Sequence, residues 1–169
     1  QYRHPIKTMM LPRLRFLSLT HSYNYKQAEL KDKFKYTKKY MNWHDAQTHC
    51  RSHEIDLATV TDDTENAFLA GVLDSENDQN AWIGLSKRQG LWQWQWSDNS
   101  SVSSSVQWET GQPDNVNSTE DCVSADTDGQ MADDTCSTRL PFYCRENTKI
   151  QLFRNILSRF LFVYFPFSF

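Results

Sequence analysis

The chain of 169 residues is long enough for one domain with a single core, and its six Trp, seven Tyr and ten Phe predict an aromatic core. The net charge of −3 is unevenly distributed: residues 1–39 carry ten Lys or Arg against two acids, and the remainder carries eight against nineteen. A nucleic-acid surface needs basic residues on a folded face, whereas these are scattered through a segment without hydrophobic periodicity. Nucleic-acid binding is therefore disfavoured.

The first 33 residues are expected to form a basic, irregular N-terminal tail (1–33). Residues 9–20 resemble the apolar core of a signal peptide, but Pro12, Arg13 and Arg15 interrupt it, so no signal peptide is evident. The chain also begins with Gln rather than Met. We therefore expect a fragment or an imperfect gene model, with a folded domain that starts near residue 34.

A short aromatic strand is predicted over residues 34–40, and a helix follows that Asn42 can cap. Asp45 occupies the third position of this helix, where its side chain can complete the cap. Spacings of three and four residues predict one buried face, made of Trp43, Ala46 and Cys50.

A second helix is predicted from a cap at Thr61 through Leu73. Its inward residues would be Phe68, Leu69 and Val72. The pattern then changes to strands, because residues 81–85 are a short apolar run and residues 91–96 alternate aromatic with polar side chains.

The remainder of the domain is predicted to be mostly loop. Residues 97–105 are rich in Ser, Asn and Asp, and the chain beyond Trp108 is rich in Asp, Asn, Thr and Gly until a last short strand over residues 141–144. Long loops inside a compact domain are usually functional or indicate a misread element. A bound cation and a disulfide would explain how such a loop stays ordered.

An acidic stretch within this loop has the ligands that calcium requires. Gln112-Pro113-Asp114 is followed by Glu120, so amide and carboxylate oxygens flank a proline-stiffened loop. From residue 112 to 134 there is no Lys or Arg, and there are seven acids: Asp114, Glu120, Asp121, Asp126, Asp128, Asp133 and Asp134. A cation would relieve their repulsion. The alternative is an acidic surface loop solvated by water.

The four cysteines, Cys50, Cys122, Cys136 and Cys144, allow three disulfide pairings, among which their spacing does not choose. None forms a Cys-x-x-Cys motif, so two disulfides are favoured over a zinc or redox site. Disulfides imply an oxidising compartment, and hence a secreted or cell-surface protein. His49 and His53 are one helical turn apart, which also permits a zinc site, although a solvated helix face explains them equally well.

Residues 147–169 are expected to be an apolar C-terminal tail. Its apolar residues from 152 to 161 share one helical face, but the final uncharged run is only ten residues, too short to span a bilayer. An amphipathic surface helix, which would place the domain near a membrane, and a partner-binding tail are two alternatives. We favour the third, read-through sequence without selected structure.

Four motifs in order make the chain, over residues 34–146, resemble a C-type lectin-like domain: Trp82-Ile83-Gly84-Leu85, Gln112-Pro113-Asp114, Glu120-Asp121-Cys122 and Phe142-Tyr143-Cys144. The resemblance implies an α+β fold in which two helices flank two small antiparallel sheets, with a long calcium-binding loop region. It also implies disulfides between Cys50 and Cys144 and between Cys122 and Cys136. The bond before Pro113 is expected to be cis.

The resemblance further implies that Gln112, Asp114, Glu120 and Asp133 bind both calcium and sugar. Ala132 stands where the family usually has the Asn of a Trp-Asn-Asp motif, which removes one metal oxygen and one sugar donor. The order Gln before Asp is similar to the galactose-type arrangement. Two functions follow as hypotheses: calcium-dependent binding of a glycan or glycoprotein with a weak galactose preference, or a domain that has lost sugar binding and recognises a protein or lipid.

An enzyme is disfavoured, because no nucleophile with a neighbouring base stands out and the cysteines are expected to be oxidised. Two N-glycosylation acceptors, Asn117-Ser118-Thr119 and Asn99-Ser100-Ser101, are present. Asn117 lies between two expected calcium ligands, and we expect it to be modified in secreted material. The alternative is a chance match in a chain rich in Asn, Ser and Thr.

Overall fold

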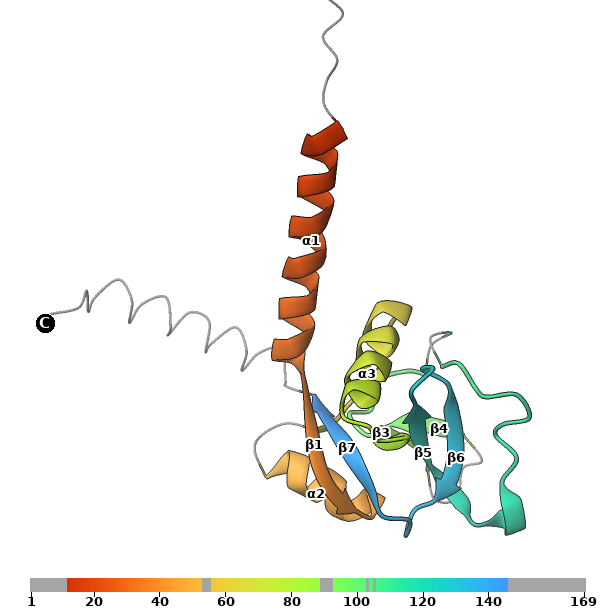
Figure 1. Ribbon diagram of the computed structural model, residues 1–169. Helices are drawn as coiled ribbons and strands as arrows, with labels where there is room; N and C mark the ends of the chain where they lie inside the picture. The colour runs from red at the N-terminus through yellow and green to blue at the C-terminus, as the bar shows by residue number, and fades with distance from the viewer. Residues whose placement is uncertain (1–11, 53–55, 89–92, 103, 105, 146–169) are drawn as a thin grey trace, which may run out of the picture.

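The structure is a computed structural model that describes residues 12–52, 56–88, 93–102, 104 and 106–145 (Figure 1). The expected C-terminal tail, residues 147–169, lies outside these ranges, as does His53 of the zinc alternative. Within them, no helix is both long enough and apolar enough to cross a membrane.

The expectation of an irregular N-terminal tail is wrong for residues 12–33, which form the helix α1 (Pro12–Lys33). The helix projects from the domain (Figure 1), and its C-terminal end contacts α3 (Asp63–Ser75). Leu30 is fully buried there, and Lys33 Nζ lies 2.5 Å from Glu65 Oε1 of α3. Because the sequence of α1 has no repeating apolar positions at helical spacing, periodicity could not indicate this helix.

The sheet contains seven strands among the described residues, in the order β1-β7-β3-β5-β6, with β2 on β7 and β4 on β3. Their bounds are β1 (Phe34–Met41), β2 (Asp56–Leu57), β3 (Asn80–Lys87), β4 (Trp94–Trp96), β5 (Glu120–Asp126), β6 (Met131–Thr135) and β7 (Leu140–Arg145). The neighbours are antiparallel except β3 and β7, which pair in parallel at Trp82 and Phe142. The α+β fold is as expected, but this parallel contact joins the two antiparallel sheets into one.

The helix α2 (Trp43–Arg51) begins as predicted, because Asn42 Oδ1 accepts a hydrogen bond from the Asp45 backbone N at 2.8 Å. The predicted cap of α3 at Thr61 is wrong by one residue. Asp62 Oδ1 accepts from the Glu65 backbone N at 2.8 Å, and the Thr61 hydroxyl instead donates to Glu65 Oε2 at 2.9 Å. The buried side chain of Glu65 thus takes Thr61 as a partner, and the cap moves to the following acid.

The hairpin of β5 and β6 lies in a segment predicted to be loop. Its sequence is acidic, but Val123 and Met131 are fully buried where the hairpin joins the sheet. The turn closes on Asp126, whose Oδ1 accepts from the backbone N of Asp128 and Gln130 at 2.9 and 2.7 Å. Pairing with β3, which is distant in sequence, therefore specifies β5 where the local pattern does not.

The core has two parts on the two sides of the sheet's centre. The larger part joins α1 and α3 to the sheet through residues that include Leu30, Leu69, Leu73, Ile83, Trp96 and Tyr143. The smaller part packs Trp43, Trp82 and Phe142 around Cys50 and Cys144. The disulfides are Cys50–Cys144 and Cys122–Cys136, the pairing that the resemblance implies, and the second one ties β5 to the chain just after β6. The His49 ring lies edge-on against Phe142 at 5.3 Å.

Candidate cation site

Three of the four expected calcium ligands converge at one end of the sheet. Asp114 lies in the loop before β5, Glu120 begins β5 and Asp133 lies in β6, and one carboxylate oxygen of each lies within 4.8 Å of the others. Calcium binds oxygen at about 2.3 to 2.6 Å, so ligands on opposite sides of the ion lie about 5 Å apart. The donor set and its spread therefore fit one calcium ion.

The loop before β5 is wrapped around two of these carboxylates. Asp133 Oδ1 accepts from the backbone N of Asp114 and its Oδ2 from that of Asn115, both at 3.0 Å. Glu120 Oε2 accepts from the backbone N of Val116 at 2.7 Å. Three consecutive N–H groups thus point at the acids, which orders the loop and offsets part of the negative charge.

Gln112 lies beside the cluster. The Gln112–Pro113 bond is cis, as the resemblance implies, and Gln112 Oε1 accepts from the backbone N of Asp114 at 3.2 Å. This amide is half-buried, while Asp114 is exposed. The loop therefore presents an amide and a carboxylate side by side.

Neither Ala132 nor Asp134 contributes a carboxylate to the cluster found among the described residues. Ala132 pairs with Ser124 of β5. The neighbouring acid, Asp134, is engaged elsewhere, because its Oδ1 accepts from the backbone N of Thr135 at 2.6 Å and from Thr138 Oγ1 at 2.9 Å. Asp134 Oδ1 is therefore directed at the turn after β6 and not at the cluster.

Burial raises the pKa of the Glu120 carboxyl above its ordinary value, and the nearby carboxylates of Asp133 and Asp114 raise it further. The Val116 N–H acts in the opposite direction. Like charges are therefore held together here against their repulsion. A bound divalent cation would remove that cost.

The structure adds a cation that sequence reasoning missed. Lys87, the last residue of β3, donates from Nζ to the backbone oxygen of Glu120 at 2.8 Å, and the same atom lies 3.8 Å from Asp133 Oδ2. The acidic stretch itself has no Lys or Arg, but β3 pairs with β5 and brings Lys87 to it. Only the pairing of two strands far apart in sequence could have revealed this contact.

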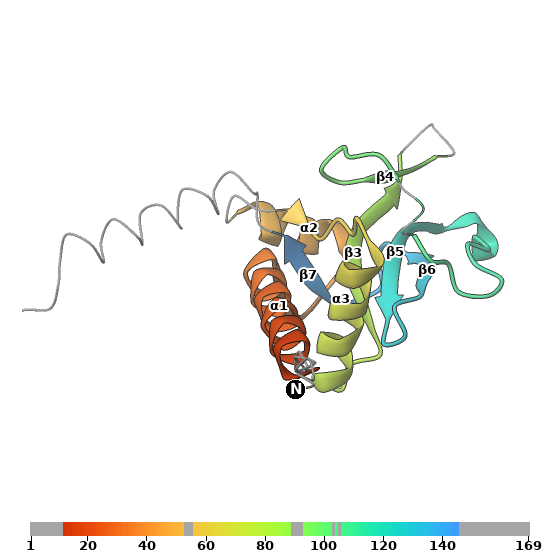
Figure 2. The ribbon, with the colours of Figure 1, turned by 90° about the horizontal axis from the view of Figure 1, so that it is seen from above.

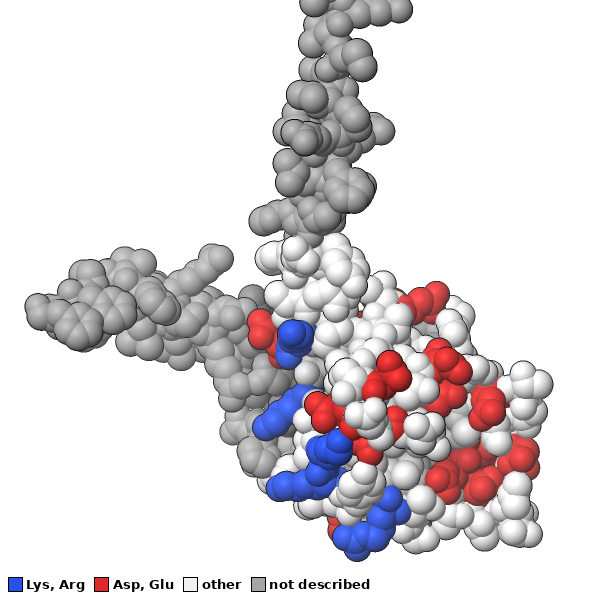
Figure 3. Space-filling model, viewed as in Figure 1, with Lys and Arg blue, Asp and Glu red and all other residues white. Residues whose placement is uncertain are grey.

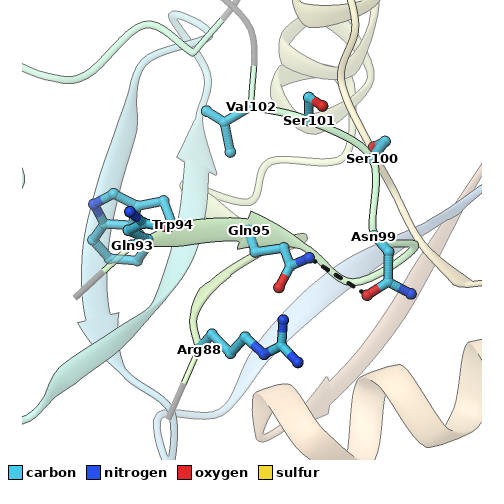
Figure 4. A pocket seen from close by; sticks show the side chains of 8 residues that line it. All are labelled: Arg88, Gln93, Trp94, Gln95, Asn99, Ser100, Ser101 and Val102. Atoms are coloured by element: carbon cyan, nitrogen blue, oxygen red, sulfur yellow. Dashed lines mark hydrogen bonds between the residues drawn. The ribbon is translucent and has the colours of Figure 1, made fainter. Parts of the chain in front are cut away.

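A hollow of about 220 Å³ lies on β4 and the loop after it, away from the carboxylate cluster (Figure 4). Arg88 and Gln95 face each other across it, and Asn99 lies on its rim, where its Oδ1 accepts from Gln95 Nε2 at 3.5 Å. Asn99, one of the two N-glycosylation acceptors, is exposed on this loop. The other, Asn117, is exposed in the loop around the carboxylates. The two acceptors thus belong to different surfaces.

The charges of the domain are separated on its surface. Figure 3 shows acidic side chains over α3 and over the side formed by β5, β6 and the loop before β5, while the basic side chains seen in this view lie on the other side, near β1. Seen from above, α3 and β3 lie between α1 and the strands β5 and β6 (Figure 2). The carboxylate cluster therefore lies on the negative end of the molecule, where a cation is attracted.

The sequence and the fold match known proteins. The family described as "Lectin C-type domain" matches residues 39–146. C-type mannose receptor 2 of Homo sapiens is 32% identical over 108 residues, which are 63% of this chain but only 7% of the receptor. Human lithostathine has a TM-score of 0.62 and is 28% identical, over 68% of this chain and 90% of that one.

A mouse scavenger receptor C-type lectin carbohydrate-recognition domain has a TM-score of 0.60 and is 25% identical, over 68% of this chain and 88% of that one. The chain therefore belongs to the C-type lectin domain family.

Proposed function

We propose that this domain is an extracellular, calcium-dependent binder of glycans or glycoproteins, with a weak preference for galactose-type sugars. Gln112, Asp114, Glu120 and Asp133 would hold both the ion and the sugar. The observation that carries this proposal is the convergence of three carboxylates, from three separate segments, within 4.8 Å. The two disulfides support an oxidising, extracellular setting.

The exposure of each residue suggests its role. Asp133 is buried and would anchor the ion, while Asp114 is exposed and Glu120 half-buried, so their oxygens can reach a ligand from solvent. In a calcium-bound sugar, two adjacent hydroxyls each give a lone pair to the ion and donate a proton to a carboxylate. Asp114 and Glu120 would accept those protons, and Gln112 would supply the one remaining amide donor.

The test is retention on immobilised galactose and mannose in calcium, followed by elution with a chelator. The chain should be retained and then released, with stronger retention on galactose. Glu120→Gln should abolish retention, whereas Glu109→Gln, which neutralises an exposed acid outside the cluster, should not. Retention that a chelator does not reverse would contradict calcium-dependent binding.

Ala132→Asn is expected to tighten calcium binding on the order of tenfold, because it offers one more oxygen to a shell that normally has six to eight. Sugar retention should rise with it, since the new amide can also donate to a hydroxyl. Calorimetric titration with calcium measures the first effect. Ala132→Val, which adds bulk without an oxygen, is the control. An unchanged calcium affinity in Ala132→Asn would place residue 132 outside the shell.

Asn117→Gln is expected to increase retention on galactose for protein secreted from a eukaryotic host. Asn117 is exposed in the short 3₁₀ turn Val116–Ser118, between Asp114 and Glu120, so a glycan there would stand beside the ion. Asn99→Gln, at the other acceptor, is the control and should leave retention unchanged. Equal retention of the Asn117 forms, with occupancy confirmed by mass spectrometry, would show that sugar does not enter here.

Recognition of a protein or lipid without sugar is the second candidate. It is favoured by the missing oxygen at Ala132 and by Lys87, whose ammonium already lies near Asp133. A domain with this function would show calcium-independent binding and no retention on either sugar, so the same column experiment separates the two candidates.

A further inference from the structure

Lys87 is enclosed behind the carboxylate cluster. Besides its hydrogen bond to the Glu120 backbone oxygen, its Nζ lies 3.7 Å from Asp121 Oδ1 and 3.8 Å from Asp133 Oδ2. It also lies 4.8 Å from the centre of the Trp94 ring. Only 13% of the Lys87 side chain is exposed. Because an ammonium loses hydration when it is enclosed, these neighbours must compensate for the lost water.

Asp133 connects Lys87 to the cation site. Its side chain is fully buried, and its oxygens already accept from the backbone N of Asp114 and Asn115. Lys87 of β3 lies near Oδ2, the oxygen that Asn115 also contacts, whereas Oδ1 faces the backbone of the exposed Asp114. A calcium ion that enters beside Asp114 would therefore share Asp133 with the ammonium.

We propose that Lys87 is an internal counter-cation of the carboxylate cluster, which stabilises the loop without metal and competes with calcium for Asp133. The second half of this inference rests on the proposed function. Two positive charges on one carboxylate repel each other at close range. Removal of the Lys87 charge should therefore lower the stability of the metal-free protein and raise its calcium affinity. Removal of a residue that merely supports the fold would lower both.

Lys87→Met tests the proposal, because it keeps a long apolar side chain against Trp94 and removes the charge together with the hydrogen bond to the Glu120 backbone oxygen. We expect about tenfold tighter calcium binding by calorimetry and a lower urea midpoint in the presence of a chelator. Lys38→Met is the control. Lys38 lies on β1, at the edge of the sheet opposite to β6, and its Nζ is 3.5 Å from Asp78 Oδ2. It changes the net charge equally and should leave calcium affinity unchanged.

A double-mutant cycle with Asp133→Asn in metal-free protein provides an independent readout. Removing the charge of Lys87 should cost less stability when residue 133 is already neutral. Calcium affinity in Lys87→Met that equals or falls below that of the original chain would overturn the competition. If none of the proteins binds calcium, the proposed function fails, and the double-mutant cycle alone tests the counter-cation role. A coupling energy between Lys87 and Asp133 would support that role, and additive losses of stability would refute it.

Discussion

Glu65→Ala is expected to destabilise the fold by about 3 to 5 kcal/mol, because it leaves two enclosed cations, Lys33 and Arg145, without the carboxylate that neutralises them. The Glu65 side chain is 1% exposed, and its oxygens lie 2.5 Å from Lys33 Nζ and 3.5 Å from Arg145 Nη1. It also accepts from the backbone N and the hydroxyl of Thr61, both at 2.9 Å. One carboxylate therefore joins the end of α1, the start of α3 and β7. Urea unfolding at constant slope measures the loss.

Two further variants show whether the unpaired charges cause this loss. Glu29→Ala removes the exposed partner of Lys26 on α1, 3.7 Å away, and should cost less than about 1 kcal/mol. The triple change Lys33→Met, Glu65→Leu and Arg145→Met replaces the whole cluster by apolar side chains and should recover most of the stability. If the triple variant is as unstable as Glu65→Ala, lost hydrogen bonds and packing, rather than unpaired charge, are responsible.

The sequence predicts best those features that depend on neighbouring residues. The aromatic strand at residues 34–40, the Asn42 cap and the apolar strand at residues 81–85 all appear, because capping and short apolar runs are local signals. The disulfide pairing and the cis bond before Pro113 agree with the family resemblance. Spacing alone could not have chosen among three disulfide pairings.

The features that sequence reasoning missed depend on contacts between distant segments. The end of α1 is held by Leu30 and by the pair of Lys33 with Glu65, 32 residues away. The hairpin of β5 and β6 is acidic and lacks the alternation of a half-buried strand, and its pairing with β3 places it in the sheet. The same pairing brings Lys87 to the carboxylate cluster. A pattern within one segment cannot contain such information.

Of the candidate site, the sequence identified the acids but not their surroundings. The structure brings Asp114, Glu120 and Asp133 together, and Gln112 Oε1 accepts a hydrogen bond from the backbone N of Asp114. Their roles in binding calcium and sugar remain predictions. The three N–H groups of the loop and the ammonium of Lys87 are the parts that a charge count along the chain could not supply.

Removing the Cys50–Cys144 disulfide, as Cys50→Ala with Cys144→Ala, is expected to cost about 4 to 5 kcal/mol. The bridge spans 94 residues, so its loss releases much chain entropy in the unfolded state. Cys122→Ala with Cys136→Ala opens a span of only 14 residues and should cost about 3 kcal/mol. Urea unfolding of the two double variants under oxidising conditions compares the losses.

For calcium affinity we expect the reverse order: loss of the short bridge should have the larger effect. Cys50–Cys144 joins α2 to β7 within the smaller part of the core, and neither cysteine lies on a strand that carries a cluster carboxylate. Cys122 lies two residues after Glu120, and Cys136 three residues after Asp133, so the short bridge fixes the two strands that carry these acids. Calcium affinity, measured by calorimetry where each variant is folded, should therefore fall on loss of the short bridge and hold on loss of the long one. Equal affinities in both variants would mean that pairing of β5 with β6 alone positions Glu120 and Asp133.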